Sequence, residues 1–243
     1  MRYCFFLLLF VPSLIFAQKK EKQEKIVYFT DSEVKRSRIS LATDGAGFYS
    51  NRNRLGQGFN PGGAAGDEEP STNGTFAWNA GGHIIFSLNR SLELWTGVVY
   101  ATAGWTDRHY DFNDMRTTMR ANLEYINVPI QFSFHSAINE ILDLEVLPML
   151  EVNILSAYDE AVYDRSSDVL LNTTNLAADP DARRINYTIG LSISANFKFA
   201  DNWSVYTRPF FHYMLNSLID DSDRPRDVLI GAGLGVGLRY KFN

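Results

Sequence analysis

The chain has 243 residues, a net charge of −5, and 45% hydrophobic and 14% aromatic residues. This apolar content excludes an intrinsically disordered chain, and the isoelectric point of about 5.4 argues against a nucleic-acid-binding protein, which carries a basic surface. No run of apolar residues reaches the roughly 18 that a membrane-spanning helix needs.

The amino terminus has the pattern of a secretory signal peptide. The basic start Met1-Arg2 precedes the apolar run Phe5–Phe16, and the small residue Ala17 follows it. We therefore predict that residues 1–17 are a signal peptide, cleaved after Ala17. Cleavage removes Cys4, the single cysteine of the sequence, so the exported chain has no disulfide and no thiol chemistry.

A charged segment follows the predicted signal peptide. From Gln18 to Arg38, seven basic residues stand against four acidic ones, which is a net charge of +3. We interpret residues 18–37 as a solvated periplasmic leader to the first folded strand. A docking peptide for a protein partner is the functional alternative.

From residue 38 to residue 243 the dominant period is two, which is the alternation of a β-strand. The pattern is clearest at the end of the chain, where eight apolar residues from Val228 to Phe242 alternate mainly with glycine and charged residues. Eight such segments are predicted, at about 38–50, 75–88, 92–105, 125–134, 142–154, 187–199, 203–216 and 228–242.

Short and long connections alternate between these segments. The short ones fall near residues 89–90, 135–140 and 200–202, and the long ones near 51–73, 106–121, 157–184 and 217–227. Bacterial outer-membrane barrels have an even number of antiparallel strands, short periplasmic turns and longer external loops. We therefore predict that residues 38–243 form an all-β fold, an eight-stranded antiparallel transmembrane β-barrel of the outer membrane. A soluble lipocalin-like barrel, with its apolar face inward, is the alternative.

The polar face of the segments carries charged residues, which favours an outward apolar face and a polar lumen. We predict a charge network that fills the narrow lumen, formed by Asp143, Glu145, Glu151, Lys198 and Arg208. Asp143 and Glu145 would lie about 6.5–7 Å apart along one strand, so an acid–base pair is the catalytic alternative. Aromatic residues near strand ends, Trp105 among them, are typical of interfacial girdles.

The sequence shows no arrangement of residues that marks a catalytic, metal or cofactor site. The histidines lack the spacing of a metal motif, and no serine is singled out as a nucleophile. We therefore expect no enzymatic activity and no cofactor. The acidic external loops are predicted to face solvent, with partner binding or cation bridging to lipopolysaccharide as their functional alternatives.

Two stretches resemble a known family, and a third resembles a general signal of outer-membrane barrels. Leu123–Ile130, with its tyrosine, aliphatic and proline residues, resembles a strand of the PorT-like outer-membrane β-barrel family of Bacteroidetes, and Val146–Leu150 is similar to the next strand of that family. At the end of the chain, Gly237, Tyr240 and Phe242 resemble the carboxy-terminal signal by which barrels are recognised for insertion, although Asn243 follows the last aromatic residue.

The resemblance implies an eight-stranded outer-membrane barrel, and the eponymous family member is linked to type IX protein secretion. We expect a non-enzymatic accessory or anchoring subunit of a larger outer-membrane assembly, such as the type IX secretion system. The expected partners are outer-membrane lipid, lipopolysaccharide, and proteins bound through the periplasmic leader or the external loops, but not nucleic acid. A small channel or ligand-binding barrel is the alternative, and a lipid-modifying enzyme is the third hypothesis.

Overall fold

The computed structural model describes residues 39–55, 71–89, 91–112, 115–177, 179, 181–219 and 226–242. The predicted signal peptide and the predicted leader, residues 1–37, lie outside these ranges. In the part of the chain that is described, no helix is long or apolar enough to cross a membrane.

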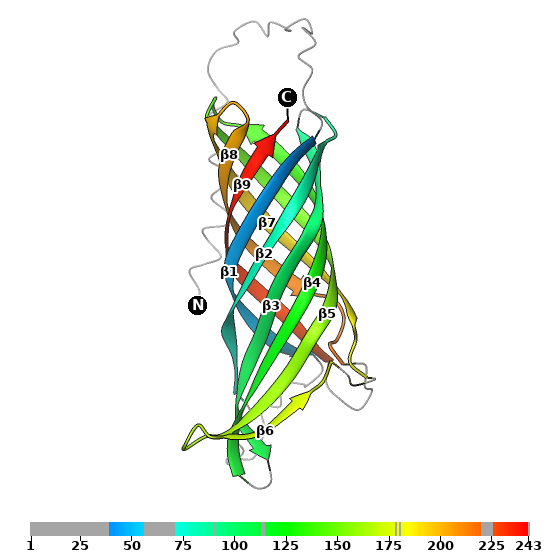
Figure 1. The fold of residues 1–243 in the computed structure, drawn as a ribbon, viewed down its shortest axis with the longest axis vertical. Helices are drawn as coiled ribbons and strands as arrows, with labels where there is room; N and C mark the ends of the chain where they lie inside the picture. Colours follow the sequence, from blue (N-terminus) through cyan, green and yellow to red (C-terminus); the bar gives the residue numbers. More distant parts are fainter. Residues whose placement is uncertain are drawn as a thin grey trace, which may run out of the picture. The chain divides into compact units, whose positions relative to one another are not determined.

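The described residues form nine β-strands of one antiparallel sheet (Figure 1). The strands are β1 (Ile39–Leu55), β2 (Ser71–Ser87), β3 (Leu92–Phe112), β4 (Met115–Ala137), β5 (Leu142–Asp164), β6 (Leu170–Asn175), β7 (Ile185–Ala200), β8 (Trp203–Met214) and β9 (Arg226–Lys241). Eight of them follow in the order β4-β3-β2-β1-β9-β8-β7-β5, and the pairing of β4 with β5 closes the ring. The predicted eight-stranded antiparallel barrel is therefore confirmed.

Both ends of the barrel chain and its three short connections lie at one rim. Ser40 of β1 pairs with Lys241 of β9, and Ile39 pairs with Phe86 near the end of β2. The short links from β2 to β3, from β4 to β5 and from β7 to β8 join their strands at this same rim. Because short turns face the periplasm in outer-membrane barrels, we identify this as the periplasmic rim.

Side chains alternate across the barrel wall. Large apolar residues point outward and remain exposed, as Leu191 (50%) and Leu234 (55%) illustrate, whereas polar residues such as Gln131 and Ser194 are buried inside. A closed wall pairs its backbone groups within the chain and presents an apolar surface to lipid. The apolar face thus points outward as predicted, and the protein belongs to the outer membrane.

Two of the predicted long loops are largely paired strand. β3 extends to Phe112 and β4 begins at Met115, so most of the predicted loop 106–121 is a hairpin. β5 runs to Asp164, and β6 pairs with its last residues inside the predicted loop 157–184. Strands β4 and β5 have 23 residues each, more than the roughly 9–11 that cross a membrane. Beyond the lipid, strand pairing needs no apolar face, so the sequence pattern ends before the strands do.

Asp164 ends β5 and holds the turn that leads to β6. Its carboxylate accepts hydrogen bonds from the Ser166 hydroxyl at 2.6 Å and from the backbone N–H groups of Ser166 and Ser167 at 2.7 and 2.9 Å. The hydroxyl and the two amides stabilise the charged form and lower the pKa of Asp164 to about 2. The turn therefore keeps its charge-assisted hydrogen bonds throughout the physiological pH range.

The glycines on the inner face of β9 differ in how closely an added Cβ atom would approach the neighbouring atoms. A Cβ added at Gly237 would overlap the Tyr206 ring and lie 2.6 Å from the Thr43 carbonyl oxygen. A Cβ added at Gly235 would lie 3.4 Å from its nearest neighbour, the Cβ of Ala46. Because the lumen of an eight-stranded barrel is only wide enough for side chains, the buried Tyr206 ring requires glycine at position 237.

We predict that Gly237→Ala lowers the free energy of unfolding by about 1–3 kcal/mol, the usual cost of overpacking. Gly235→Ala, two residues away on the same face, should change it by less than about 1 kcal/mol, because the added methyl group meets ordinary contacts. Equilibrium unfolding of the refolded barrel in lipid vesicles measures both values. Equal losses in the two variants would show that the Tyr206 contact is not what requires the glycine.

Candidate functional site

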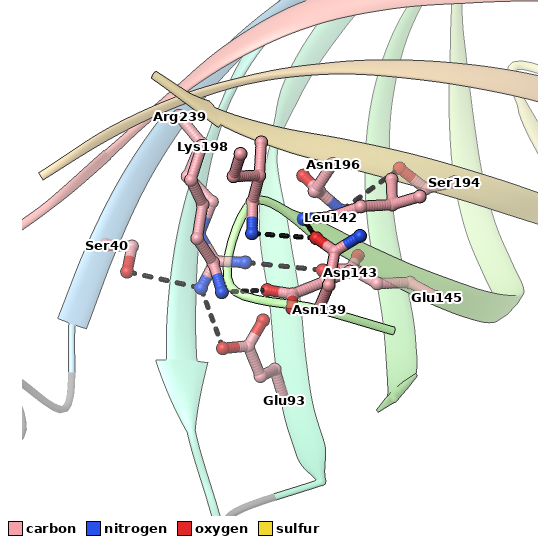
Figure 2. Close-up of polar contacts among 11 residues, drawn as sticks. Ser40, Glu93, Asn139, Leu142, Asp143, Glu145, Ser194, Asn196, Lys198 and Arg239 are labelled. Carbon is pink, nitrogen blue, oxygen red and sulfur yellow. Dashed lines mark hydrogen bonds and ion pairs between the residues drawn. The ribbon is translucent and has the colours of Figure 1, made fainter. Parts of the chain in front are cut away.

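The periplasmic end of the lumen holds a cluster of five charged residues, here called the vestibule cluster (Figure 2). Its members come from four strands: Glu93, Asp143, Glu145, Lys198 and Arg239. Arg239 Nη2 donates to Glu93 Oε1 at 2.7 Å, and Arg239 Nη1 lies 3.5 Å from Glu145 Oε1. Lys198 Nζ lies 2.7 Å from Asp143 Oδ2. These residues border a cavity of about 610 Å³, the vestibule, which residues of the short periplasmic turns also line.

A second cluster, here called the central cluster, lies deeper in the lumen around the buried carboxylate of Asp44. The His83 Nε2 atom is 3.0 Å from Asp44 Oδ1, and the Tyr206 hydroxyl donates to Asp44 Oδ2 at 3.2 Å. The Arg208 guanidinium pairs with the same carboxylate and donates to Gln131 Oε1 at 3.1 Å. Residues of strands β1, β2 and β8 thus meet at one carboxylate, and Gln131 of β4 joins them through Arg208.

The outer half of the lumen is filled mainly by apolar residues. The buried members of this outer cluster are Trp105, Ala121, Leu123, Tyr125, Leu155, Tyr158, Leu176, Met214, Leu218, Val228 and Leu229. Beside it, Arg52 pairs with Asp107 and lies 3.2 Å from Asp227, with its guanidinium carbon 4.8 Å from the Trp105 ring. The prediction of Trp105 as an interfacial girdle residue is wrong, because its side chain is fully buried inside the barrel.

The five residues predicted as a lumen network occupy different levels. Asp143, Glu145 and Lys198 lie in the vestibule cluster, whereas Arg208 belongs to the central cluster and pairs with Asp44. Glu151 is buried beside Asn127 and forms no ion pair with a described residue. The five residues therefore do not form one continuous network.

Sequence reasoning left out several partners in these clusters, notably Arg239, Glu93 and Asp44. Their positions in the two-residue alternation of each strand place them on the inner face of the barrel. This pattern could have identified them from the sequence. Their partners are far away in sequence, however. Arg239 and Glu93 are 146 positions apart, and Arg208 and Asp44 are 164 positions apart.

The residues of the predicted barrel-assembly signal lie at the end of β9 and just beyond it. Gly237 packs against Tyr206, as described above, and the Tyr240 ring centroid is 4.8 Å from that of Trp203 and 5.1 Å from that of Phe242. Trp203 and Phe242 are 40% and 41% exposed, so these rings form an aromatic patch at the periplasmic rim. Such a position suits a membrane–water interface, and the role in insertion remains a prediction.

The catalytic and metal-site alternatives depend on how the histidines and carboxylates of the described lumen are arranged. Among the described residues, no three histidine, cysteine, aspartate or glutamate side chains lie close enough together to hold a metal ion. His83 is bonded to Asp44 through Nε2, but its Nδ1 atom has no hydrogen-bond partner, so no described serine completes a triad. Asp143 and Glu145, the alternative acid–base pair, are engaged by Lys198 and Arg239.

Comparison with protein-family models and with curated proteins finds no match for this chain. Among solved structures it is similar to a major outer membrane protein from Thermus thermophilus, with 13% identity, a TM-score of 0.48, and coverage of 84% of this chain and 99% of the other. It is also similar to Neisserial surface protein A, with 10% identity, a TM-score of 0.44, and coverage of 85% and 98%. For the outer membrane protease OmpT from Escherichia coli the values are 10%, 0.45, 84% and 96%. These likenesses concern the barrel alone and carry no argument about activity.

We predict that Arg208→Met lowers the free energy of unfolding by about 3–5 kcal/mol, because it leaves the buried Asp44 carboxylate without its guanidinium partner. Lys198→Met should cost at most about 1 kcal/mol, since the Lys198 side chain is 45% exposed and water replaces its contact with Asp143. Denaturant unfolding in vesicles measures both variants. If both variants lost the same free energy of unfolding, the conclusion that the deeper Arg208–Asp44 ion pair stabilises the fold more than the Lys198–Asp143 pair would be wrong.

Proposed function

We propose that this chain is a non-enzymatic, non-conducting outer-membrane barrel that serves as an anchoring or accessory subunit of a larger outer-membrane assembly. The observation that carries the proposal is the filling of the lumen above the vestibule. Arg208 and His83 meet the Asp44 carboxylate inside the lumen, and the outer cluster of apolar side chains lies beyond them.

Two of the cavities among the described residues support a non-conducting barrel by their small size. Two small cavities lie beyond the vestibule, one of about 30 Å³ bordered by Tyr125 and Met214 and one of about 50 Å³ bordered by Gln131 and Arg208. Spaces of this size hold a few water molecules at most. An eight-stranded barrel has little width to spare, so a continuous aqueous path would require these side chains to move.

A barrel that acts as an anchor binds its partner proteins through surfaces outside the lumen. The predicted leader at the periplasmic side is one candidate surface, and the hairpin of β5 and β6 at the opposite end is another. Strand β6 is exposed along its whole length, including Leu170 at 53%, and the adjoining Val169 is 56% exposed. Apolar residues left outside a membrane barrel suit a protein partner. The resemblance to PorT-like barrels makes the type IX secretion machinery the assembly to test first.

We predict that the purified barrel shows no steady openings in planar lipid bilayers, because its lumen is occupied by paired charges and packed apolar side chains. Single-channel recording of the full-length mature protein measures this directly. A large-pore porin recorded in the same bilayer provides the positive control. Reproducible openings of fixed conductance would contradict the proposal and favour the channel hypothesis.

We also predict that the intact protein, extracted from outer membranes in mild detergent, retains partner proteins in fixed ratio. Mass spectrometry of the retained proteins identifies the assembly. Deletion of residues 18–35 should release partners held by the leader, and replacement of residues 165–175 by a short turn should release those held by the hairpin. Recovery of the barrel alone from the wild-type strain would count against an accessory subunit, and retention of every partner by both variants would exclude these two surfaces.

A further inference from the structure

The carboxylates of the vestibule cluster use only part of their bonding capacity. Arg239 engages Oε1 of Glu93 and Oε1 of Glu145, and Lys198 engages Oδ2 of Asp143. The second oxygen of each carboxylate, Oε2 of both glutamates and Oδ1 of Asp143, has no hydrogen-bond partner. Figure 2 shows the three carboxyl groups converging around the side chains of Arg239 and Lys198.

These unpartnered oxygens are buried, and their burial costs free energy of folding. Glu93 is 4% exposed and Glu145 is 2% exposed. The polar side chains of Ser133 and Asn196 lie near Glu145. A buried acceptor without a donor costs free energy, and more so when it is charged. The cluster also has three carboxyl groups against two basic side chains. Within these five residues, acidic groups therefore outnumber basic groups, and three carboxylate oxygens lack a hydrogen-bond donor.

The residues around the vestibule indicate which kind of ligand would bond the unpartnered carboxylate oxygens. The amide oxygens of Asn196 and Asn202 and the Nδ1 atom of His135, which also line the vestibule, have no hydrogen-bond partner either. A metal ion is not favoured, since the described residues offer no group of three or more suitable ligands. An ammonium group carries a compact positive charge and three donors, and it can satisfy one or two of these carboxylate oxygens without the group of three ligands that a metal site needs.

We propose that the vestibule is a binding site for an alkylammonium group, supplied by a polyamine or by a lysine side chain of a peptide in the periplasm. The group enters from the periplasmic rim and places its N–H donors toward Glu93, Asp143 and Glu145. Ala137, which also lines the cavity, offers apolar contact to the alkyl chain. The other titratable residues that line the vestibule are His135, Asp201 and Lys241. This binding activity is additional to the proposed anchoring role and does not depend on it.

The test uses the full-length mature barrel in detergent micelles, titrated by calorimetry with spermidine and with a short blocked peptide that contains one lysine. The same peptide with an Nε-acetylated lysine is the uncharged control. We expect saturable binding of spermidine, of the lysine peptide, or of both, and none of the acetylated peptide. Binding of one probe alone identifies the source of the ammonium group. Absence of saturable binding for both probes, or equal binding of the acetylated peptide, would overturn the proposal.

Matched variants locate the binding site. Glu93→Gln and Glu145→Gln should each weaken binding by about tenfold, the effect of losing one charge-assisted hydrogen bond. Glu151→Gln is the control, because Glu151 is equally buried on the same strand as Glu145 but does not line the vestibule. Asp143→Asn, nearer the rim, provides a further variant if a buried substitution prevents folding. Equal effects of the Glu145 and Glu151 substitutions would refute the vestibule as the site. None of these results bears on the co-purification of partner proteins.

Discussion

Closure of the sheet by the pairing of β4 with β5 is the constraint on which the rest of this structure depends. In lipid, backbone N–H and C=O groups must bond within the chain, and a closed ring of strands achieves this without leaving an edge. Eight strands also set the width of the lumen, which side chains alone can fill. Inward side chains of strands that are not neighbours in the sheet therefore meet inside the lumen, as Arg239 of β9 meets Glu93 of β3 and Glu145 of β5.

The narrow lumen explains how charge and bulk coexist inside the barrel. Removing Asp44 from water is costly, and the cost is offset because Arg208, His83 and Tyr206 reach the same carboxylate from other strands. Large rings need small neighbours for the same reason, which is why Tyr206 faces Gly237. Electrostatics and packing inside the barrel thus both depend on which residues the strand order and register bring together.

The lumen has a packed part and an open part, and these two parts suit different roles. The central and outer clusters make the middle and external half a packed core, which suits a role carried out by surfaces outside the lumen. The vestibule differs, since it combines a cavity of about 610 Å³ with carboxylate oxygens that lack partners. A barrel of this kind is able to act as an anchor in the membrane while its periplasmic mouth recognises a small charged group.

The sequence by itself determined the class of the fold, the place of most strands and the inward parity of Asp143, Glu145, Glu151, Lys198 and Arg208, because side-chain direction along a strand depends only on the period of two. It could not determine which inward residues meet. Arg208 pairs with Asp44, and not with the carboxylates of β5, because register and closure bring together residues 164 positions apart. The strand extensions beyond the membrane and the burial of Trp105 were also decided by the tertiary structure alone. Outside lipid a paired strand needs no apolar face, and a position near a strand end does not reveal which side of the wall a ring occupies.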